Sequence, residues 1–282
     1  MSVPNSFLGL LLNNNYEIFP RSQVGEGKGE GSMRIGVVGL GLIGGSIFKD
    51  LILLGYDVIA VSNSQEGENI YKNYEVLKDC NIVFVCSAMN KTLEILDKLE
   101  KILAPETIVT DVCSLKQFVC QKKRSYRFVP SHPMAGTEHK GFENSFEGLF
   151  KGAKWVITPV FGESVELIEI IENLGAKPVI TTPEKHDEAV ALISHMPMVV
   201  AQAIFKTAKD NDLALEIAAS GFRDMTRLAM SNTEMANDMV QMNADNIQMS
   251  LLKLYKSIGD LTNSDYLAQI EEIKSNRQSM FL

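Results

Sequence analysis

The chain has 282 residues, 45% of them hydrophobic, which is enough apolar material for one large domain or two ordinary ones. Its formal net charge of -8 argues against a nucleic-acid partner, because phosphate binding needs a basic face. Cysteines at positions 80, 86, 113 and 120 form no Cys-x-x-Cys pair, which favours a reduced, cytoplasmic setting.

Residues 1–32 predict a flexible N-terminal extension. Residues 21–32 are mainly Gly, Ser and charged residues, which cannot bury enough surface to offset the entropy lost on ordering. The longest early apolar run, residues 7–12, is too short to span a bilayer, and no Lys or Arg precedes it. We therefore expect neither a targeting signal nor a membrane partner.

Residues 33–182 predict an α/β domain with a Rossmann-type, doubly wound sheet. Short apolar runs alternate with helix-length segments, as in parallel sheets that are buried on both faces. The expected strands are 34–38, 57–61, 82–86, 107–112, 127–129, 155–158 and 178–181, and the clearest helices are 43–54 and 91–103.

Residues 183–282 predict an all-helical domain. Thr182 followed by Pro183 is typical of a helix start, with a capping side chain and then proline in the first turn. The rest is rich in Ala, Met, Leu, Gln and Glu at helical spacing, with breaks near Pro197 and Gly221. Because its Met and Leu content exceeds what one small bundle buries, we expect a homodimer through this domain, with a Met-rich core of the single chain as the alternative.

The first strand is followed by the glycine motif Gly39-Leu40-Gly41-Leu42-Ile43-Gly44, which also opens the first helix. In this context the motif predicts a dinucleotide-binding turn. Gly39 would allow the tight turn, Gly41 the approach of a pyrophosphate, and Gly44 close packing of helix on strand. The first helical residues, Leu42 and Ile43, would offer N–H groups to the phosphates.

After the second strand come Ser62, Asn63 and Ser64, where NAD-binding proteins usually carry an acidic residue for the ribose. Without a carboxylate to repel a 2′-phosphate, the site favours NADP, although the arginine expected for NADP is missing too, so NAD stays open. The alternative is that these residues only form a turn and that Asp57 or Glu66 reaches the ribose.

Ligands of open α/β sheets bind beyond the carboxyl ends of the strands, so residues that follow each strand are candidates for the site. Ser87 follows the third strand and is expected at the cofactor. Ser114 follows the fourth strand and His132 the fifth. His132 is the predicted catalytic base, because imidazole titrates near neutral pH and can accept the proton of an alcohol during oxidation. No metal site is predicted.

The chain resembles the prephenate and arogenate dehydrogenases, most of all the compact cyanobacterial-type members. The matching segments are residues 33–44, 111–116, 132–138, 194–197 and 219–227. The glycine motif is generic, whereas the histidine motif and the Ser-Gly-Phe-Arg-Asp run are specific to the family. The resemblance implies oxidative decarboxylation of arogenate or prephenate in tyrosine biosynthesis, with hydride transfer to NADP or NAD.

The resemblance also implies a role for each matching residue. His132 would accept the proton of the ring hydroxyl as hydride leaves the same carbon, and loss of CO2 would make the ring aromatic. Ser114 would hydrogen-bond near that hydroxyl, with a helix N-cap as the alternative. Thr137 and Glu138 would line the substrate pocket, or else act as a cap or an ion pair. Arg227 would bind a substrate carboxylate through its planar guanidinium, with a solvated surface arginine as the alternative.

Two histidines of the second domain compete for the substrate pocket. His186 and His195 are nine positions apart, so a straight helix places them on opposite faces, and only one should reach the pocket unless Pro197 bends the helix. The Ser-His-x-Pro run of the family favours His195 as a substrate-binding residue. His186, beside Asp187, is equally well explained as a structural histidine at a helix end.

Arogenate with NADP is the reading that the resemblance favours, but prephenate stays open, since the two substrates differ only in an amino or keto side chain. Met198 stands where some prephenate-specific members carry a histidine, and the segment between the second and third strands is short for the family. Two alternatives are weighed. The first is a β-hydroxyacid or 6-phosphogluconate-type dehydrogenase, but the Gly-Gly-x6-Lys segment of those enzymes is missing after Thr182. The second is a non-catalytic NADP-binding sensor, which would need no catalytic base such as His132.

Overall fold

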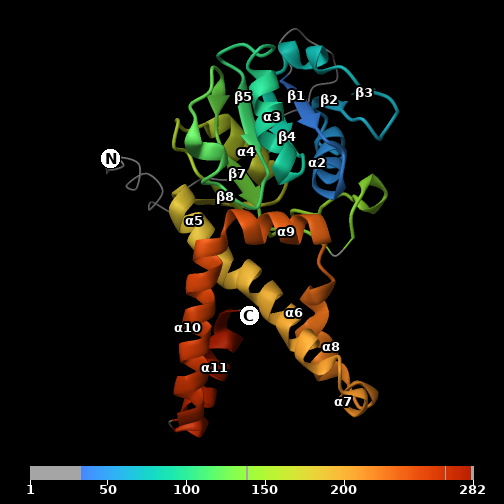
Figure 1. Ribbon diagram of the computed structural model, residues 1–282. Coiled ribbons are helices and arrows are strands. Elements are labelled where there is room, and N and C mark those ends of the chain that lie inside the picture. The colour runs from blue at the N-terminus through green and yellow to red at the C-terminus, as the bar shows by residue number, and fades with distance from the viewer. Residues whose placement is uncertain (1–32, 138, 264, 281–282) are drawn as a thin grey trace. The chain divides into compact units, whose positions relative to one another are not determined.

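The computed structural model describes residues 33–280 except 138 and 264, which form a sheet-containing half and a helical half (Figure 1). The predicted extension at residues 1–32 and the candidate Glu138 therefore lie outside the described residues. The strands are β1 (Arg34–Val38), β2 (Asp57–Val61), β3 (Ile70–Tyr71), β4 (Ile82–Val85), β5 (Ile108–Asp111), β6 (Arg127–Phe128), β7 (Ser131–Pro133), β8 (Lys154–Ile157) and β9 (Lys177–Ile180).

The helices fall into two groups. Those among the strands are α2 (Leu42–Leu53), α3 (Met89–Leu99) and α4 (Val165–Asn173), with the short turns η1 (Tyr74–Asp79), η2 (Val119–Gln121) and η3 (Phe142–Asn144). Those that follow are α5 (Pro183–Val190), η4 (Ala191–His195), α6 (Met196–Ala208), α7 (Asp212–Glu216), α8 (Ser220–Thr226), η5 (Arg227–Met230), α9 (Thr233–Met242), α10 (Ala244–Asn263) and α11 (Tyr266–Met280).

The first sheet is parallel, with the strand order β3-β2-β1-β4-β5-β6. Ile35, Val37, Val83 and Phe84 in its centre have no exposed surface, which is why these strands read as continuous apolar runs. Strand order reverses between β1 and β4, and ligands of doubly wound sheets bind at such a switch point. The predicted Rossmann-type sheet is confirmed.

A separate three-stranded sheet contains β7, β8 and β9, with β7 antiparallel to β8. The runs at 155–158 and 178–181 are strands, as predicted, but they pair here and not with the parallel sheet. β7 was not predicted, because Ser131-His132-Pro133 has no apolar alternation. It is held by Trp155, which is fully buried and donates from Nε1 to Ser131 Oγ at 2.9 Å. This sheet therefore positions His132.

The second half is entirely helical, as predicted, and α5 begins where expected. Thr182 Oγ1 accepts a hydrogen bond from the Lys185 N–H at 3.3 Å, and Pro183 occupies the first turn. Before α6 the helix widens into the π-helical turn η4. Pro197 explains this turn, since it has no N–H to donate and its ring crowds the carbonyl of Ile193 four residues earlier.

One apolar cluster connects the helical half with the sheet half. Met89 of α3 and Leu115 of the loop after β5 pack in it against residues of α5, α6 and α9. The buried members of the cluster are Met89, Cys113, Leu115, Val190, Met198, Ala236 and Met239.

The helical stretch Pro183–Ala208 is long and apolar enough to cross a membrane by length and composition alone. Core helices of other proteins pass the same test.

Candidate active site

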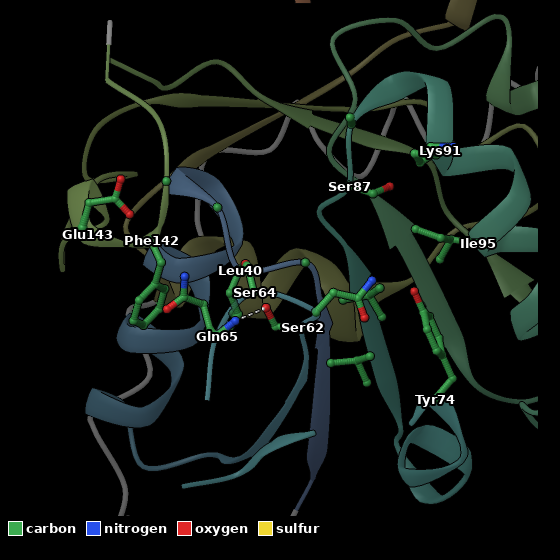
Figure 2. Close-up of a pocket in the computed structure, with 17 residues that line it drawn as sticks. Leu40, Ser62, Ser64, Gln65, Tyr74, Ser87, Lys91, Ile95, Phe142 and Glu143 are labelled. Atoms are coloured by element: carbon green, nitrogen blue, oxygen red, sulfur yellow. Dashed lines mark hydrogen bonds between the residues drawn. The ribbon is translucent and has the colours of Figure 1, made fainter. Parts of the chain in front are cut away.

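A cavity of about 550 Å³ opens at the carboxyl ends of β1, β2 and β4 (Figure 2). It brings together most of the predicted cofactor-binding residues. From that set it is lined by Gly39, Gly41, Ser62, Asn63, Ser64 and Ser87. The lining that was not predicted includes Gln65, Tyr74, Lys91, Ile95, Phe142 and Glu143.

The three motif glycines have the local roles that were expected of them. Gly39 has φ of +91°, and a Cβ there would lie 2.7 Å from the Cys86 carbonyl oxygen. A Cβ on Gly44 would lie 1.9 Å from the Gly39 carbonyl oxygen, so only glycine lets α2 approach β1 this closely. A Cβ on Gly41 would meet no atom within 4 Å, because Gly41 faces the open cavity.

The amino end of α2 supplies hydrogen-bond donors at the cavity. Its N-cap, Gly41, provides no side-chain acceptor for the first turn. Leu42, Ile43 and Gly44 form that first turn, next to the cavity lining, and their N–H groups have no earlier helical carbonyl to bind. Such a helix end binds phosphate well, so the cavity fits a dinucleotide.

The turn after β2 has hydroxyl and amide side chains toward the cavity. Ser62 Oγ accepts from the Gln65 N–H at 3.1 Å, so these residues do form a turn as well as lining the cavity. The ammonium group of Lys72 donates to the Asn63 carbonyl at 3.0 Å. Neither alternative acid is in the lining. Asp57 pairs with Arg34 at the other end of β2, at 2.7 Å, and Glu66 lies 3.5 Å from Lys72.

The remaining walls come from segments without a sequence signal. Tyr74 of η1 and Ile95 of α3 lie on one side of the cavity, and Phe142 and Glu143 of η3 on the other (Figure 2). Burial raises the pKa of Tyr74. These walls are distant in sequence from the glycine motif, so only the tertiary structure identifies them.

His132 lies on β7 and is partly exposed. Its Nδ1 is 2.9 Å from Nε2 of His186, and the two rings meet edge to face. Nδ1 of His186 is in turn 2.7 Å from Oδ1 of Asp187. His186 and Asp187 are both buried, with 2% and 3% exposure. A chain of three side chains thus runs from the predicted base into the helical half.

The pKa of His132 lies well below its usual value of 6.5, first because of desolvation and then because of His186 and Lys116 nearby. At neutral pH the imidazole is therefore uncharged and able to accept a proton. This agrees with the predicted role of His132 as a base, which stays a prediction.

His195 is also buried, with 1% exposure, and burial lowers its pKa to about 4. Asn243 Nδ2 is 3.2 Å from its Nδ1 and also donates to the Asp187 carbonyl at 3.0 Å. The straight-helix case, in which His186 and His195 face opposite sides, does not apply, because the helix is widened just before Pro197. The wide turn η4 between them reduces the rotation per residue, so both belong to one cluster.

A buried ion pair supports the strand that carries His132. Lys116 and Asp111 are both 0% exposed; Lys116 Nζ donates to Asp111 Oδ2 and to the carbonyl of Ser131. Ser114 stands in the same loop and is half-buried. The alternative that it caps a helix was wrong, because the next helical turn, η2, begins at Val119 with Phe118 as its N-cap.

The other predicted substrate residues lie at the surface of the single chain. Arg227 begins η5, which packs against α6, and it is exposed. Arg223, four residues earlier, is 3.8 Å from Asp224 in an exposed ion pair. Thr137 is exposed, and its Oγ1 accepts from the His139 N–H at 3.2 Å. Met198 is 4% exposed and packs in the core between the two halves.

Two family models match most of the chain. The model described as "Prephenate dehydrogenase, nucleotide-binding domain" matches residues 50–180, and the model described as "Prephenate dehydrogenase, dimerization domain" matches residues 182–273. The first match begins within α2, so the glycine turn lies before it and is supported by its own geometry.

Individual relatives agree with these models. The chain is 31% identical over 238 residues to the prephenate dehydrogenase of Bacillus subtilis (strain 168), covering 75% of this chain and 64% of the length of that relative. The structure of Synechocystis arogenate dehydrogenase is similar with 33% identity and a TM-score of 0.73, over 88% of this chain and 97% of that one. The structure of prephenate dehydrogenase from A. aeolicus, in complex with hydroxyphenyl propionate and NAD+, is also similar. Its identity is 26% and its TM-score 0.78, over 89% of this chain and 99% of that one.

Proposed function

The chain belongs to the prephenate dehydrogenase family, and on that premise we propose that it catalyses the oxidative decarboxylation of arogenate or prephenate in tyrosine biosynthesis, with hydride transfer to NADP or NAD. The observation that carries the proposal is the partly exposed His132, whose pKa is lowered by burial and whose Nδ1 lies 2.9 Å from His186, in a chain that also has a cavity at its glycine turn. A nicotinamide cofactor would accept the hydride.

In this mechanism the protein moves one proton. His132 takes the proton of the ring hydroxyl while a hydride leaves the carbon that bears this hydroxyl. The bond to the ring carboxylate then breaks, its electron pair enters the ring, and CO2 departs. The proton returns from His132 to the new phenol oxygen, so proton and charge balance without another reactant. Ser114 would hydrogen-bond the hydroxyl and hold it toward His132.

Arg227 is proposed to bind a carboxylate of the substrate. A guanidinium meets a carboxylate with two hydrogen bonds, and a protein with a net charge of -8 needs such a local cation to hold an anionic substrate. Thr137, Glu138 and His195 are proposed to line the substrate pocket. Asn243 lies 3.2 Å from Nδ1 of His195, so a ligand would have to meet this buried ring at Nε2.

NADP is proposed as the preferred cofactor, and arogenate as the preferred substrate. Ser62, Asn63 and Ser64 present no carboxylate to a 2′-phosphate, and the carboxylate that does line the cavity, Glu143, comes from η3 on another wall. The turn itself has no cation, and Lys72, whose ammonium donates to the Asn63 carbonyl at 3.0 Å, is proposed to supply one. The support for arogenate is the similarity to the Synechocystis enzyme.

A homodimer through residues 183–282 is also proposed, with residues 33–182 as the cofactor-binding domain. The name of the second family model supports this, as do exposed apolar side chains on α10 such as Leu252 and Tyr255. A cytoplasmic location is proposed because the four cysteines are free, and burial raises the pKa of Cys80, Cys113 and Cys120 to about 12, which keeps them as unreactive thiols.

Steady-state turnover of arogenate and of prephenate, each with NADP and with NAD, tests the activity. We expect oxidation with CO2 release, fastest with arogenate and NADP. Binding without turnover of either substrate would support the sensor alternative instead.

Calorimetric titration with 2′,5′-ADP and with 5′-AMP tests the cofactor preference without turnover. Lys72→Met should weaken 2′,5′-ADP binding several-fold and leave 5′-AMP binding unchanged, while Lys72→Arg should preserve both. Equal loss for both ligands would contradict a role for Lys72 at the 2′-phosphate.

A further inference from the structure

We propose that Asp187, acting through His186, fixes the tautomer of His132 so that the proton of its neutral ring is on Nδ1 and the free lone pair is on Nε2. The catalytic consequence rests on the proposed function, whereas the tautomer itself follows from the hydrogen bonds. Asp187 and His186 would then be positioning residues for the base.

Both carboxylate oxygens of Asp187 accept hydrogen bonds from backbone N–H groups. Oδ1 accepts from the Lys116 N–H at 2.8 Å and Oδ2 from the Gln117 N–H at 2.9 Å. Two N–H donors stabilise the ionised form of a carboxyl group. An ionised carboxylate can only accept, so the remaining partner of Oδ1, His186 Nδ1 at 2.7 Å, must be a donor.

His186 is buried, with 2% exposure, and in the proposed state its ring is neutral, with one N–H and one acceptor nitrogen. A proton on Nδ1 then leaves Nε2 as an acceptor. The partner of that nitrogen is His132 Nδ1 at 2.9 Å, which must therefore donate. Since the His132 ring is itself uncharged, its Nε2 is bare and can take a proton from a ligand.

The neighbouring contacts hold this chain in one geometry. Asn243 fixes the backbone of Asp187, and Lys116, whose N–H binds Asp187, also binds the carbonyl of Ser131 beside His132 with its side chain. When Nε2 of His132 accepts a proton, Nδ1–H stays bonded to His186. The positive charge of the ring is then stabilised through His186 by the buried carboxylate.

The direct test is the imidazole nitrogen spectrum of the full chain, labelled with ¹⁵N-histidine and recorded near pH 7.5 without substrate or cofactor. The chain has only four histidines, so single variants assign each signal. We expect His132 and His186 both with a protonated Nδ1 and a bare Nε2. A proton on Nε2 of His132 would overturn the proposal, even if the chain proved to be an active dehydrogenase.

Two substitutions separate a tautomer effect from simple packing. His186→Gln keeps a donor for Asp187 and an acceptor for His132, and it should preserve the His132 tautomer and most of kcat. His186→Phe fills the same space without an acceptor, so His132 should shift toward protonated Nε2, and kcat should fall roughly 10²-fold or more with KM little changed. Equal kcat in the two variants, or an unchanged His132 tautomer in His186→Phe, would refute the proposal that His186 fixes the tautomer of His132.

An exposed aspartate provides the matched control for substitutions at the carboxylate. Asp187→Leu removes the acceptor and should act like His186→Phe, whereas Asp210→Asn, which affects an exposed ion pair with Lys209 at 2.9 Å, should leave spectrum and turnover unchanged. If His186→Phe or Asp187→Leu fails to fold, the unmodified chain and His186→Gln still decide the question through the spectrum. Absence of turnover with all substrates would defeat the proposed function alone.

Discussion

At the scale of the residue, the imidazole of His132 combines two properties that rarely coincide. It is partly exposed, so a ligand can reach it, yet its pKa is held well below 6.5 by desolvation and then by the nearby His186 and Lys116. A base needs both properties, because it must meet its substrate and be uncharged when it does so.

Replacing His132 removes the proton acceptor without touching the dinucleotide cavity. His132→Asn should lower kcat by roughly 10²- to 10⁴-fold, the usual range for loss of a general base, while the affinity for cofactor stays the same. Steady-state kinetics and cofactor titration measure the two effects. His139→Asn, at an exposed position outside β7, is the control, and unchanged turnover in His132→Asn would contradict the mechanism.

The lowered pKa of His132 also predicts the pH dependence of turnover. The active form is the neutral ring, and a pKa below 6.5 means that this form is retained as pH falls through 6.5. The acidic limb of kcat/KM should therefore lie below pH 6.5, and activity should be lost only under more acidic conditions. A limb at or above pH 6.5 in a kcat/KM profile would contradict this assignment.

At the scale of the element, the glycine turn offers a matched pair of substitutions. In Gly44→Ala the new Cβ would lie 1.9 Å from the Gly39 carbonyl oxygen, so α2 must move off β1, and we expect a loss of stability of about 1–3 kcal/mol or more. Gly41→Ala meets no atom within 4 Å and should leave stability nearly unchanged while weakening dinucleotide binding. Denaturant unfolding measures the stability of each variant, and cofactor titration measures its dinucleotide binding. Equal stabilities of Gly44→Ala and Gly41→Ala would contradict the packing argument.

Strands and helices differed in how far the sequence predicted them. β1 and β2 were predicted to the residue, because a buried parallel strand is a continuous apolar run with polar flanks. β7 was not predicted, since its three residues are held by Trp155 and by pairing with β8, which are long-range contacts. The π-helical turn η4 was not predicted either, and neither was the contact between His186 and His132.

The candidate site was predictable to a similar extent. Gly39, Gly41 and the residues after β2 were identifiable because a local motif follows a strand. Tyr74 and Phe142, on the other walls of the cavity, stand in short 3-10 turns far along the chain, and no local pattern connects them with the glycine motif. Tertiary packing decides such walls.

At the scale of the whole molecule, the helical half exposes apolar side chains that a single chain leaves uncovered. Leu252, Tyr255 and Ile258 of α10 are 56%, 78% and 51% exposed. Leu252→Asp should convert the proposed dimer to monomers, because burying an unpaired carboxylate in an apolar interface is unfavourable. Sedimentation equilibrium measures the change, Lys101→Asp after α3 is the control, and a monomeric unmodified chain would exclude the dimer.

The hydrogen bond between His132 and His186 joins the two halves of the protein through the ring of the proposed base. Without α5, the imidazole on β7 would have no partner to decide which of its nitrogens carries the proton. The proposed proton transfer therefore needs both halves, whereas the cavity for the nucleotide is lined by the sheet half alone.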